Sequence, residues 1–198
     1  MMNKYARLIR LFVLVGLCLV CAGGMQLCSY GYLPWERVPD RSFPVEVLLI
    51  DESVFPPGAT AGPVMPNPDS HGAVEHAGRS IYVGTGGANY EAYRYESLRQ
   101  AAREYRRQMR VWFSEGEGWT PWLVPSEVSY QSPIADQYYL ACGSHYSVSM
   151  CNMIGQYEEY FVRFNSHISP DFMTYADLER VLKAIDERMA LYLAEDSE

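Results

Sequence analysis

Hydrophobic residues recur at spacings of three and four positions in two long stretches of the chain. The first stretch covers residues 90–113, where Leu98, Tyr105 and Met109 share one side of a helical projection. The second stretch covers residues 173–194 and carries a continuous apolar stripe. Both patterns predict amphipathic helices whose apolar faces pack against a core.

Short runs rich in β-branched, aliphatic and aromatic residues predict strands. In the last of these runs the apolar Val162 and Phe164 flank the polar Arg163, as expected for a strand with two unlike faces. Residues 84–87, which include three glycines, predict a turn before the first helix. The predicted strands cover residues 43–50, 79–83, 137–142, 148–155 and 158–166.

The order of these elements predicts an α+β fold. Strands clustered between two helices favour a small antiparallel sheet of about four or five strands, with both amphipathic helices covering one face. Residues 43–198 then form a single domain, because a core of this size rarely divides. Residues 51–78 hold five prolines and four glycines, so we expect a long irregular loop there.

An apolar segment precedes this domain. Residues 1–10 carry three cations and no acid, and residues 11–35 carry no charged side chain. Cations ahead of an apolar run favour export of the chain that follows. Residues 1–28 are therefore predicted to form an apolar helix that is a signal peptide or a signal anchor, and residues 29–42 a juxtamembrane linker.

The fate of this segment is open among three alternatives, because its apolar core of about 17 residues lies between a signal peptide and a short spanning helix. Cleavage after Ala22 or after Gly24 would release a secreted domain. Lipidation of Cys21 is a second route, although Val20 is larger than the residue usual before such a cysteine. Retention as a transmembrane helix is favoured by Tyr30 and Trp35, which follow at the depth of a membrane interface.

Composition and charge narrow the classes of partner. The chain is 48% hydrophobic and contains 16 Tyr, 7 Phe and 4 Trp, which is enough apolar surface for a folded core. Its formal net charge is −8, and because three cations lie in the N-terminal segment, residues 29–198 carry −11. An acidic domain repels phosphate backbones, so nucleic acid is not an expected partner.

Five cysteines occur in the chain, and only Cys142 and Cys151 lie in the predicted domain. An even pair in an exported domain predicts a disulfide, because the compartments beyond the membrane are oxidising. Eight residues separate the two cysteines, including turn formers, so two adjacent antiparallel strands would bring the sulfurs together. Two buried thiols are the alternative.

Four arginines recur at helical spacing and form a stripe beside the apolar face of the first predicted helix. Such a stripe suits anionic headgroups, an acidic partner or a carboxylate ligand, because a guanidinium forms planar bidentate hydrogen bonds. The alternative is ion pairing within the domain, which is rich in acidic residues. The stripe consists of Arg99, Arg103, Arg106 and Arg110.

An aromatic segment follows this helix. Its Trp119 and Trp122 are candidates for stacking on a sugar or for anchoring a protein partner, because an indole combines a large contact area with a polar tip. Packing in the core of the domain is the alternative.

The loop predicted at 51–78 holds two histidines and nearby acids, which are enough donors for a metal ion. The candidate ligands are His71, Glu75 and His76. Their spacing matches no known zinc signature, and a solvated loop is the alternative. We therefore expect neither a bound metal nor a cofactor.

No motif in the chain commits it to a reaction. The leading hypothesis is a non-enzymatic interaction or accessory domain, tethered by its N-terminal segment to the membrane on the outer side of a bacterial envelope, with a protein as its partner. A ligand-binding or sensory domain that recognises an anionic or glycan ligand is the alternative. A metal-dependent hydrolase is the second alternative.

Overall fold

The computed structural model describes residues 12–21, 24, 38–66, 72–114 and 116–195. Two compact units divide the chain, Met1–Arg37 and Val38–Glu198. In the first unit, residues 12–21 are helical, and the rest of the predicted apolar helix lies mostly outside the described residues. No helix in the described ranges combines the length and hydrophobicity needed to cross a membrane. The predicted signal or anchor and the predicted linker lie mostly outside these ranges and stay predictions.

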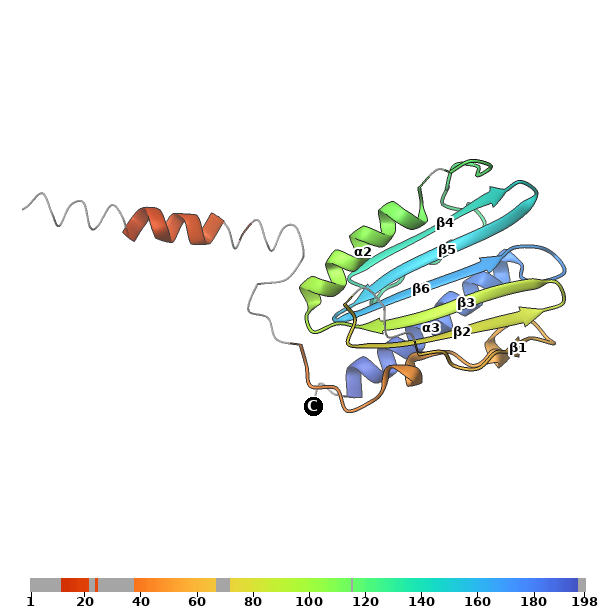
Figure 1. Cartoon of the computed structure of the whole chain (residues 1–198), viewed down its shortest axis with the longest axis horizontal. Coiled ribbons are helices and arrows are strands. Elements are labelled where there is room, and N and C mark those ends of the chain that lie inside the picture. The colour runs from red at the N-terminus through yellow and green to blue at the C-terminus, as the bar shows by residue number, and fades with distance from the viewer. Residues whose placement is uncertain (1–11, 22–23, 25–37, 67–71, 115, 196–198) are drawn as a thin grey trace, which may run out of the picture. The chain divides into compact units, whose positions relative to one another are not determined.

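The second unit is built on one antiparallel sheet of six strands (Figure 1). The spatial order is β1-β2-β3-β6-β5-β4, and the central pair, β3 with β6, joins two halves that are far apart in the sequence. The α+β class is confirmed, but the predicted four or five strands are too few. The strands are β1 (Thr60–Ala61), β2 (Glu75–Val83), β3 (Gly86–Arg94), β4 (Gln137–His145), β5 (Val148–Tyr157) and β6 (Tyr160–His167).

The two amphipathic helices pack on opposite faces of the sheet. Helix α3 (Tyr175–Glu195) lies behind the strands in Figure 1 and buries its apolar stripe in the main core. Helix α2 (Leu98–Trp112) packs on the other face, where Ala101 and Tyr105 belong to a separate, smaller core. The predicted placement of both helices on one face is therefore wrong.

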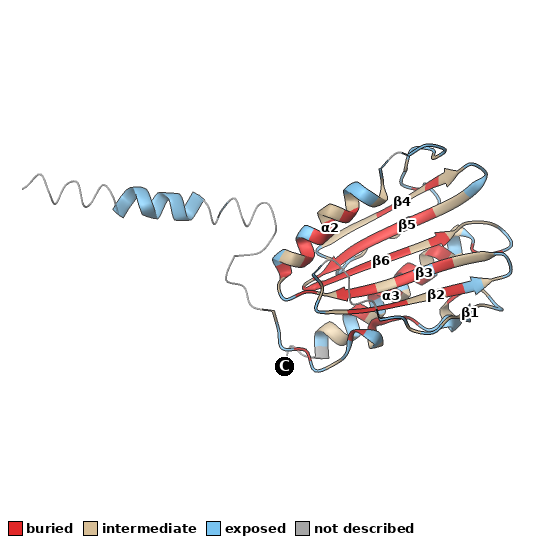
Figure 2. Ribbon diagram, in the orientation of Figure 1, coloured by how far each residue is buried: buried red, intermediate tan, exposed pale blue. Residues whose placement is uncertain are grey.

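Strand β6 shows why both faces need a cover. Tyr160, Val162 and Phe164 belong to the main core, whereas Phe161 belongs to the smaller one. Side chains alternate along a strand, so apolar residues in both registers are buried only when a layer packs on each side. Figure 2 shows the result, with buried residues concentrated in the central strands β3, β6 and β5.

The first helix begins later than its hydrophobic pattern predicts. The predicted turn at 84–87 connects β2 to β3 instead of preceding the helix, and β3 continues to Arg94. Ser97 then caps the helix, because its side-chain oxygen accepts a hydrogen bond from the Gln100 N–H at 3.2 Å. The predicted helix began too early, because the position of Tyr90 fits both the two-residue repeat of a strand and the 3.6-residue repeat of a helix.

The segment before the sheet is buried but is not extended. Residues 43–50, predicted as a strand, contain the 3₁₀ helix η1 (Val45–Leu48). Val45 and Leu48, at the two ends of η1, belong to the main core. The burial expected from this apolar run is therefore confirmed, whereas the expected strand conformation is wrong. The Tyr90 hydroxyl donates a hydrogen bond to the Leu48 carbonyl oxygen at 3.0 Å, which satisfies both of these buried polar groups.

The predicted loop at 51–78 contains more regular structure than expected. It includes the 3₁₀ helix η2 (Glu52–Val54), strand β1 and the first residues of β2. The start of β2 escaped prediction because Glu75 and His76 are polar and Gly78 interrupts the run, so no apolar period is visible there.

A buried ionic cluster ties the start of the second unit to the turn between β5 and β6. The Arg41 Nε donates to Glu159 Oε1 at 3.1 Å, and Arg41 also pairs with Glu158. Glu159 is fully buried, and the guanidinium of Arg94 lies 3.9 Å from the same carboxylate. Burial alone would lower the pKa of Arg41, but hydrogen bonding and attraction to Glu159 raise it overall. Arg41 therefore keeps its charge although its side chain is buried.

The predicted disulfide between Cys142 and Cys151 is confirmed. The two residues lie directly opposite each other on β4 and β5, with their Cα atoms 4.0 Å apart. The backbone N–H and carbonyl of Cys142 form their hydrogen bonds with Leu123, on the side away from Cys151. The two cysteines are therefore a non-hydrogen-bonded pair of the hairpin, the type of pair in which side chains lie closest together. Two exposed free cysteines, Cys18 and Cys21, lie in the first unit.

Removing this bridge should destabilise the domain. For the double variant C142A/C151A we expect a loss of about 3 kcal/mol of unfolding free energy, because the bridge limits the conformations of the unfolded chain. Urea unfolding of the oxidised full chain in detergent measures this loss. The control is the double variant C18A/C21A, which removes two cysteines outside the domain. Equal unfolding midpoints for C142A/C151A and C18A/C21A would contradict the expectation.

Candidate functional site

Helix α2 covers only part of its face of the sheet. Tyr93, Phe161 and Ile154 supply the apolar contacts beneath it. Two positions away on the same strands lie the polar residues Glu91, Arg163 and Asn152. Each of them is opposite another polar residue on a neighbouring strand. We call this area the polar face, and it consists of His76, Ser80, Asn89, Glu91, Asn152, Arg163 and Asn165.

A row of hydrogen-bonded side chains crosses the polar face. The Ser80 hydroxyl donates to Asn89 Oδ1 at 2.6 Å, and Asn89 Nδ2 donates to Asn165 Oδ1 at 3.1 Å. On the next strand, Asn152 Nδ2 donates to the Trp112 carbonyl oxygen at 3.4 Å. This direction of donation leaves the amide nitrogen of Asn165 and the amide oxygen of Asn152 without partners among the described residues. Two neighbouring strands thus present one open donor and one open acceptor.

An ion pair occupies the next row of the polar face. Glu91 and Arg163 are register partners on β3 and β6 and form a hydrogen-bonded salt bridge, and His76 Nε2 lies 3.7 Å from the same carboxylate. Burial alone would raise the pKa of Glu91, but the interaction with His76 and the hydrogen bond and charge of Arg163 lower it to about 2. The guanidinium of Arg163 also lies over the Trp112 ring, 4.8 Å from its centroid.

Two cavities lie over the polar face. The first, of about 390 Å³, is lined by Glu91 and Arg163, and we call it the ionic pocket. The second, of about 300 Å³, is lined by Asn152 and Asn165, and we call it the amide pocket. Trp112 and Asn165 line both pockets, so the two adjoin and form one groove. The ionic pocket also includes Met65, His76, Ser80 and Asn89, and the amide pocket Val111, Ser114, Trp119, Trp122 and Met150.

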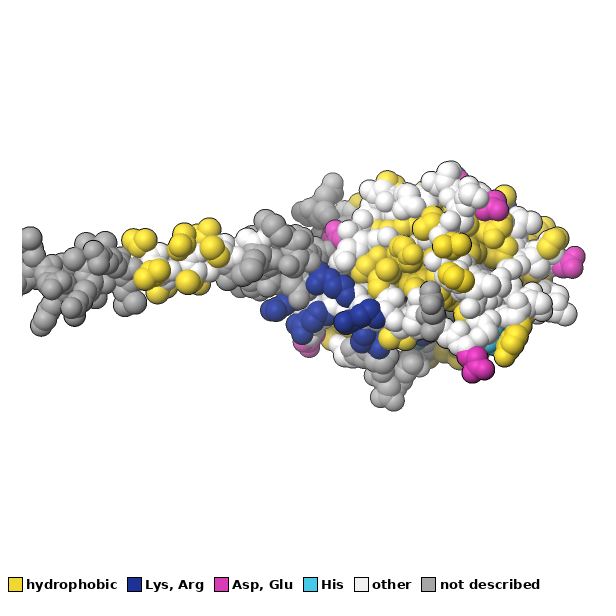
Figure 3. All heavy atoms as spheres, turned by 90° about the horizontal axis from the view of Figure 1, so that it is seen from above, with side chains coloured by type: hydrophobic (Ala, Val, Ile, Leu, Met, Phe, Trp, Pro, Cys, Tyr) yellow, Lys and Arg dark blue, Asp and Glu magenta, His cyan; other side chains and the backbone are white. Residues whose placement is uncertain are grey.

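The predicted arginine stripe lies on α2 but does not line this groove. Figure 3 shows a group of Lys and Arg side chains beside a broad area of hydrophobic ones. Arg103 and Arg110 are exposed and form no ion pair within the part of the chain that the structure describes. Arg107, outside the predicted stripe, pairs with Glu104 on the same helix. A binding role for Arg99, Arg103, Arg106 and Arg110 stays a prediction.

The two predicted tryptophans do line the groove, at the amide pocket. The Trp119 ring is stacked between Trp122 and His145, with centroids 4.9 Å from each. The Trp122 ring lies over Gly143, where an added Cβ would stand 3.3 Å from the indole, so glycine permits this close approach. The Trp122 Nε1 is buried and has no acceptor among the described residues. The rings therefore form a wall that contains one buried donor without an acceptor, rather than an open stacking platform.

The predicted metal ligands are not assembled as a group. His71 lies outside the described residues, and Glu75 and His76 are consecutive in β2, so their side chains point to opposite faces of the sheet. Glu75 pairs with Arg94 at 3.2 Å, whereas His76 lies on the polar face beside Glu91. Among the residues that the structure describes, no group of three His, Cys, Asp or Glu side chains is placed to hold a metal ion.

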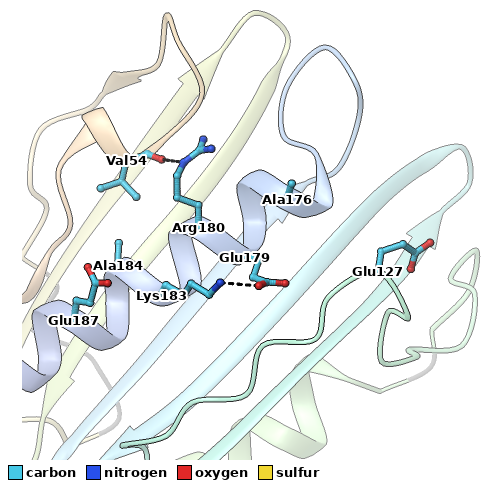
Figure 4. A pocket seen from close by; sticks show the side chains of 8 residues that line it. All are labelled: Val54, Glu127, Ala176, Glu179, Arg180, Lys183, Ala184 and Glu187. Atoms are coloured by element: carbon cyan, nitrogen blue, oxygen red, sulfur yellow. Dashed lines mark hydrogen bonds and ion pairs between the residues drawn. The ribbon is translucent and has the colours of Figure 1, made fainter.

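A larger cavity of about 620 Å³ lies on the outer side of α3 (Figure 4). Its cations are paired with neighbours: Lys183 Nζ lies 2.8 Å from Glu179, and the Arg180 Nε donates to the Val54 carbonyl oxygen at 3.0 Å. An exposed pair one helical turn apart, such as Lys183 with Glu179, contributes little free energy. The two cations that line this cavity are therefore already paired with neighbouring groups.

Sequence reasoning missed most of the polar face. Asn89, Glu91 and Asn152 were not candidate site residues, because each stands alone among apolar neighbours in the sequence. The available signal was the alternation in β6, where Arg163 and Asn165 take the face opposite Val162 and Phe164. Polar residues on one face of a central strand indicate that the helical layer does not cover that part of the face.

Comparisons with known proteins identify a fold and no family. No family model matches the chain, and no curated protein matches its sequence. Among solved structures, the extracellular domain of PknH from Mycobacterium tuberculosis is similar, with a TM-score of 0.53 and 9% sequence identity. The match covers 79% of this chain and 100% of that domain. At this identity the likeness shows the fold alone.

The ion pair on the polar face should make stability depend on pH. The folded pKa of Glu91 is about 2, below its ordinary value of 4.5, so its ionised form stabilises the fold above about pH 5 and this contribution is lost as the pH falls towards 2. We expect Glu91→Gln to lower the unfolding free energy by about 3 kcal/mol near neutral pH and by much less near pH 3.

Chemical denaturation at a series of pH values measures this difference. Glu117→Gln, which removes one negative charge from an exposed loop position, is the control. A difference between wild type and Glu91→Gln that stays constant from about pH 7 to about pH 3 would show that Glu91 does not carry this pH dependence.

Proposed function

We propose that this protein is a non-enzymatic ligand-binding domain that acts on the extracytoplasmic side of a membrane and binds its ligand in the groove over the polar face. The observation that carries the proposal is the pair of open amide atoms on Asn152 and Asn165, at the floor of a cavity. The Asn152 residue is 7% exposed, and its amide oxygen remains able to accept a hydrogen bond from water or from a ligand in the cavity.

The chemistry of the groove favours binding over catalysis. Glu91, with a pKa of about 2, stays ionised at neutral pH and is hydrogen-bonded to Arg163. A general acid or base works best with a pKa near the pH at which the enzyme operates, so this carboxylate is poorly matched to proton transfer. The same pair is well suited to fixing the orientation of a polar ligand.

Three observations support the extracytoplasmic location. The N-terminal residues carry cations ahead of an apolar run, which favours export of the following chain. The domain contains a disulfide, and disulfides persist mainly in oxidising compartments. The solved domain of similar fold is an extracellular domain. A tether made by the N-terminal segment is part of this proposal.

A thermal-shift panel on the full chain tests the proposal without assuming the ligand. Neutral sugars, amino acids, short peptides, phosphate esters and carboxylates are compared in a polyoxyethylene detergent, which carries no sugar headgroup. We expect at least one class to raise the Tm of the wild type with increasing concentration. That shift should be absent in Asn165→Phe, whose ring would fill the junction of the two pockets.

The matched control is Gln131→Phe, which places the same ring at an exposed position in the loop before β4. Circular dichroism of both variants verifies folding. Stabilisation that persists in Asn165→Phe, or the absence of stabilisation by every class of compound, would overturn the proposal that the groove is the binding site.

A role in binding a protein partner is the second candidate. It is favoured by adjacent Leu123 and Val124, whose side chains are 67% and 55% exposed, and by the hydrophobic area visible in Figure 3. Exposed apolar groups of this kind are typical of interaction surfaces. Purification of the full chain from native membranes should then recover a companion protein in fixed proportion. Recovery of the chain alone in a mild detergent would argue against this role.

A further inference from the structure

The amide pocket is electrically neutral. None of its described lining residues is Asp, Glu, Lys, Arg or His, and its polar atoms come from Asn, Ser and Trp side chains. A charged group placed there would give up part of its hydration and gain no counter-ion from the lining, which is unfavourable. The part of a ligand that enters this pocket is therefore uncharged.

The open polar atoms of the pocket define what this part must offer. Asn165 Nδ2 is a donor without an acceptor and Asn152 Oδ1 is an acceptor without a donor in the described chain, and the buried Trp122 Nε1 in the wall also lacks an acceptor there. The three atoms come from three different segments. A group that accepts and donates at several positions satisfies all of them, and neighbouring hydroxyl groups have this property.

The remaining walls are apolar. Val111, Met150 and the edges of the tryptophan rings complete the lining. Such walls contact C–H groups, and a volume of about 300 Å³ is at the small end of the range for small-molecule sites. One sugar ring, with hydroxyl groups on its edge and C–H groups on its faces, combines these requirements.

An extended peptide fits the groove less well. Peptides that bind to sheets do so by adding a strand at an open edge, where backbone donors and acceptors are available. The groove lies over the central strands β3, β6 and β5, whose backbone groups pair with each other. The outer edge of β4 is itself paired with the segment around Leu123. The open groups of the groove belong to side chains.

The ionic pocket adjoins the amide pocket at Trp112 and Asn165, so a ligand seated in one extends directly into the other. There it meets the Glu91–Arg163 pair and the Ser80 and Asn89 side chains. Charged side chains that are already paired bind hydroxyl groups well, because each ion keeps its partner while it gains a hydrogen bond.

Resting on the proposed function, we propose that the groove binds a glycan of at least two sugar units, of which one is uncharged and occupies the amide pocket. The second unit lies over the ionic pocket. Recognition then depends on amide, indole and hydroxyl groups in the first pocket and on the ion pair in the second.

Isothermal titration calorimetry on the full chain, in polyoxyethylene detergent, tests this inference. The probes are uncharged saccharides of one to four units built from glucose, galactose, mannose or N-acetylglucosamine, together with oligogalacturonate as an acidic series. We expect at least one uncharged series to bind, with affinity rising at least about tenfold from one unit to two, because the second unit gains its own contacts. Oligogalacturonate should bind more weakly than that series.

The variant Trp122→Phe separates a binding role from a structural one. It keeps an aromatic ring and removes the unpartnered N–H, so affinity for the glycan should fall about three- to tenfold, while the smaller ring makes the ligand-free protein somewhat less stable because it loses contacts with Trp119 and Gly143. The matched control is Tyr146→Phe, which removes a polar atom from a ring that is 77% exposed and outside both pockets. A variant that loses stability and keeps its affinity would contradict the assigned role of Trp122.

The outcomes separate this inference from the proposed function. If no uncharged saccharide binds, or if affinity is the same for one unit and two, the glycan assignment is overturned. A different result would be that a peptide or phosphate ester is the compound that binds, with binding abolished by Asn165→Phe. That result would overturn the glycan assignment and leave the proposed ligand-binding function intact. If no class of compound binds in the groove, both fail.

Discussion

The alternation of side chains along the central strands is the constraint on which this structure depends. These strands carry large apolar residues in both registers, so each face needs a packed layer. Helix α3 has 21 residues and α2 has 15, which is a difference of about 9 Å in length. Where the layer formed by α2 ends, Phe161 is followed two positions later by Arg163, and Asn152 stands two positions before Ile154. The groove therefore lies where the layer formed by α2 stops short of covering the sheet.

The sequence predicted the parts of this architecture that depend on local pattern. The helical stripes, the three later strands and the disulfide all follow from spacing within a single segment. The polar face does not, because its ion pair joins Glu91 to Arg163 and its amide row joins Asn89 to Asn165, on strands that meet only through the long-range pairing of β3 with β6. Short-range periodicity carries no information about which strands become neighbours.

Sequence identity carries little information about this groove either. The extracellular domain of similar fold shares 9% of its residues with this chain. A fold survives such divergence because it requires only apolar residues at alternating positions, with volumes that fill the core. A row of hydrogen-bonded amides requires particular atoms at particular positions, so a shared fold does not imply a shared amide row.

The ionic cluster at the start of the second unit has a mechanical consequence. Arg41 lies where the N-terminal chain enters this unit, and it is paired with Glu158 and Glu159, at the turn that joins β5 to β6. The same hairpin carries the open amide groups of Asn152 and Asn165. Tension applied through the N-terminal chain is therefore transmitted to the two strands that form the floor of the amide pocket.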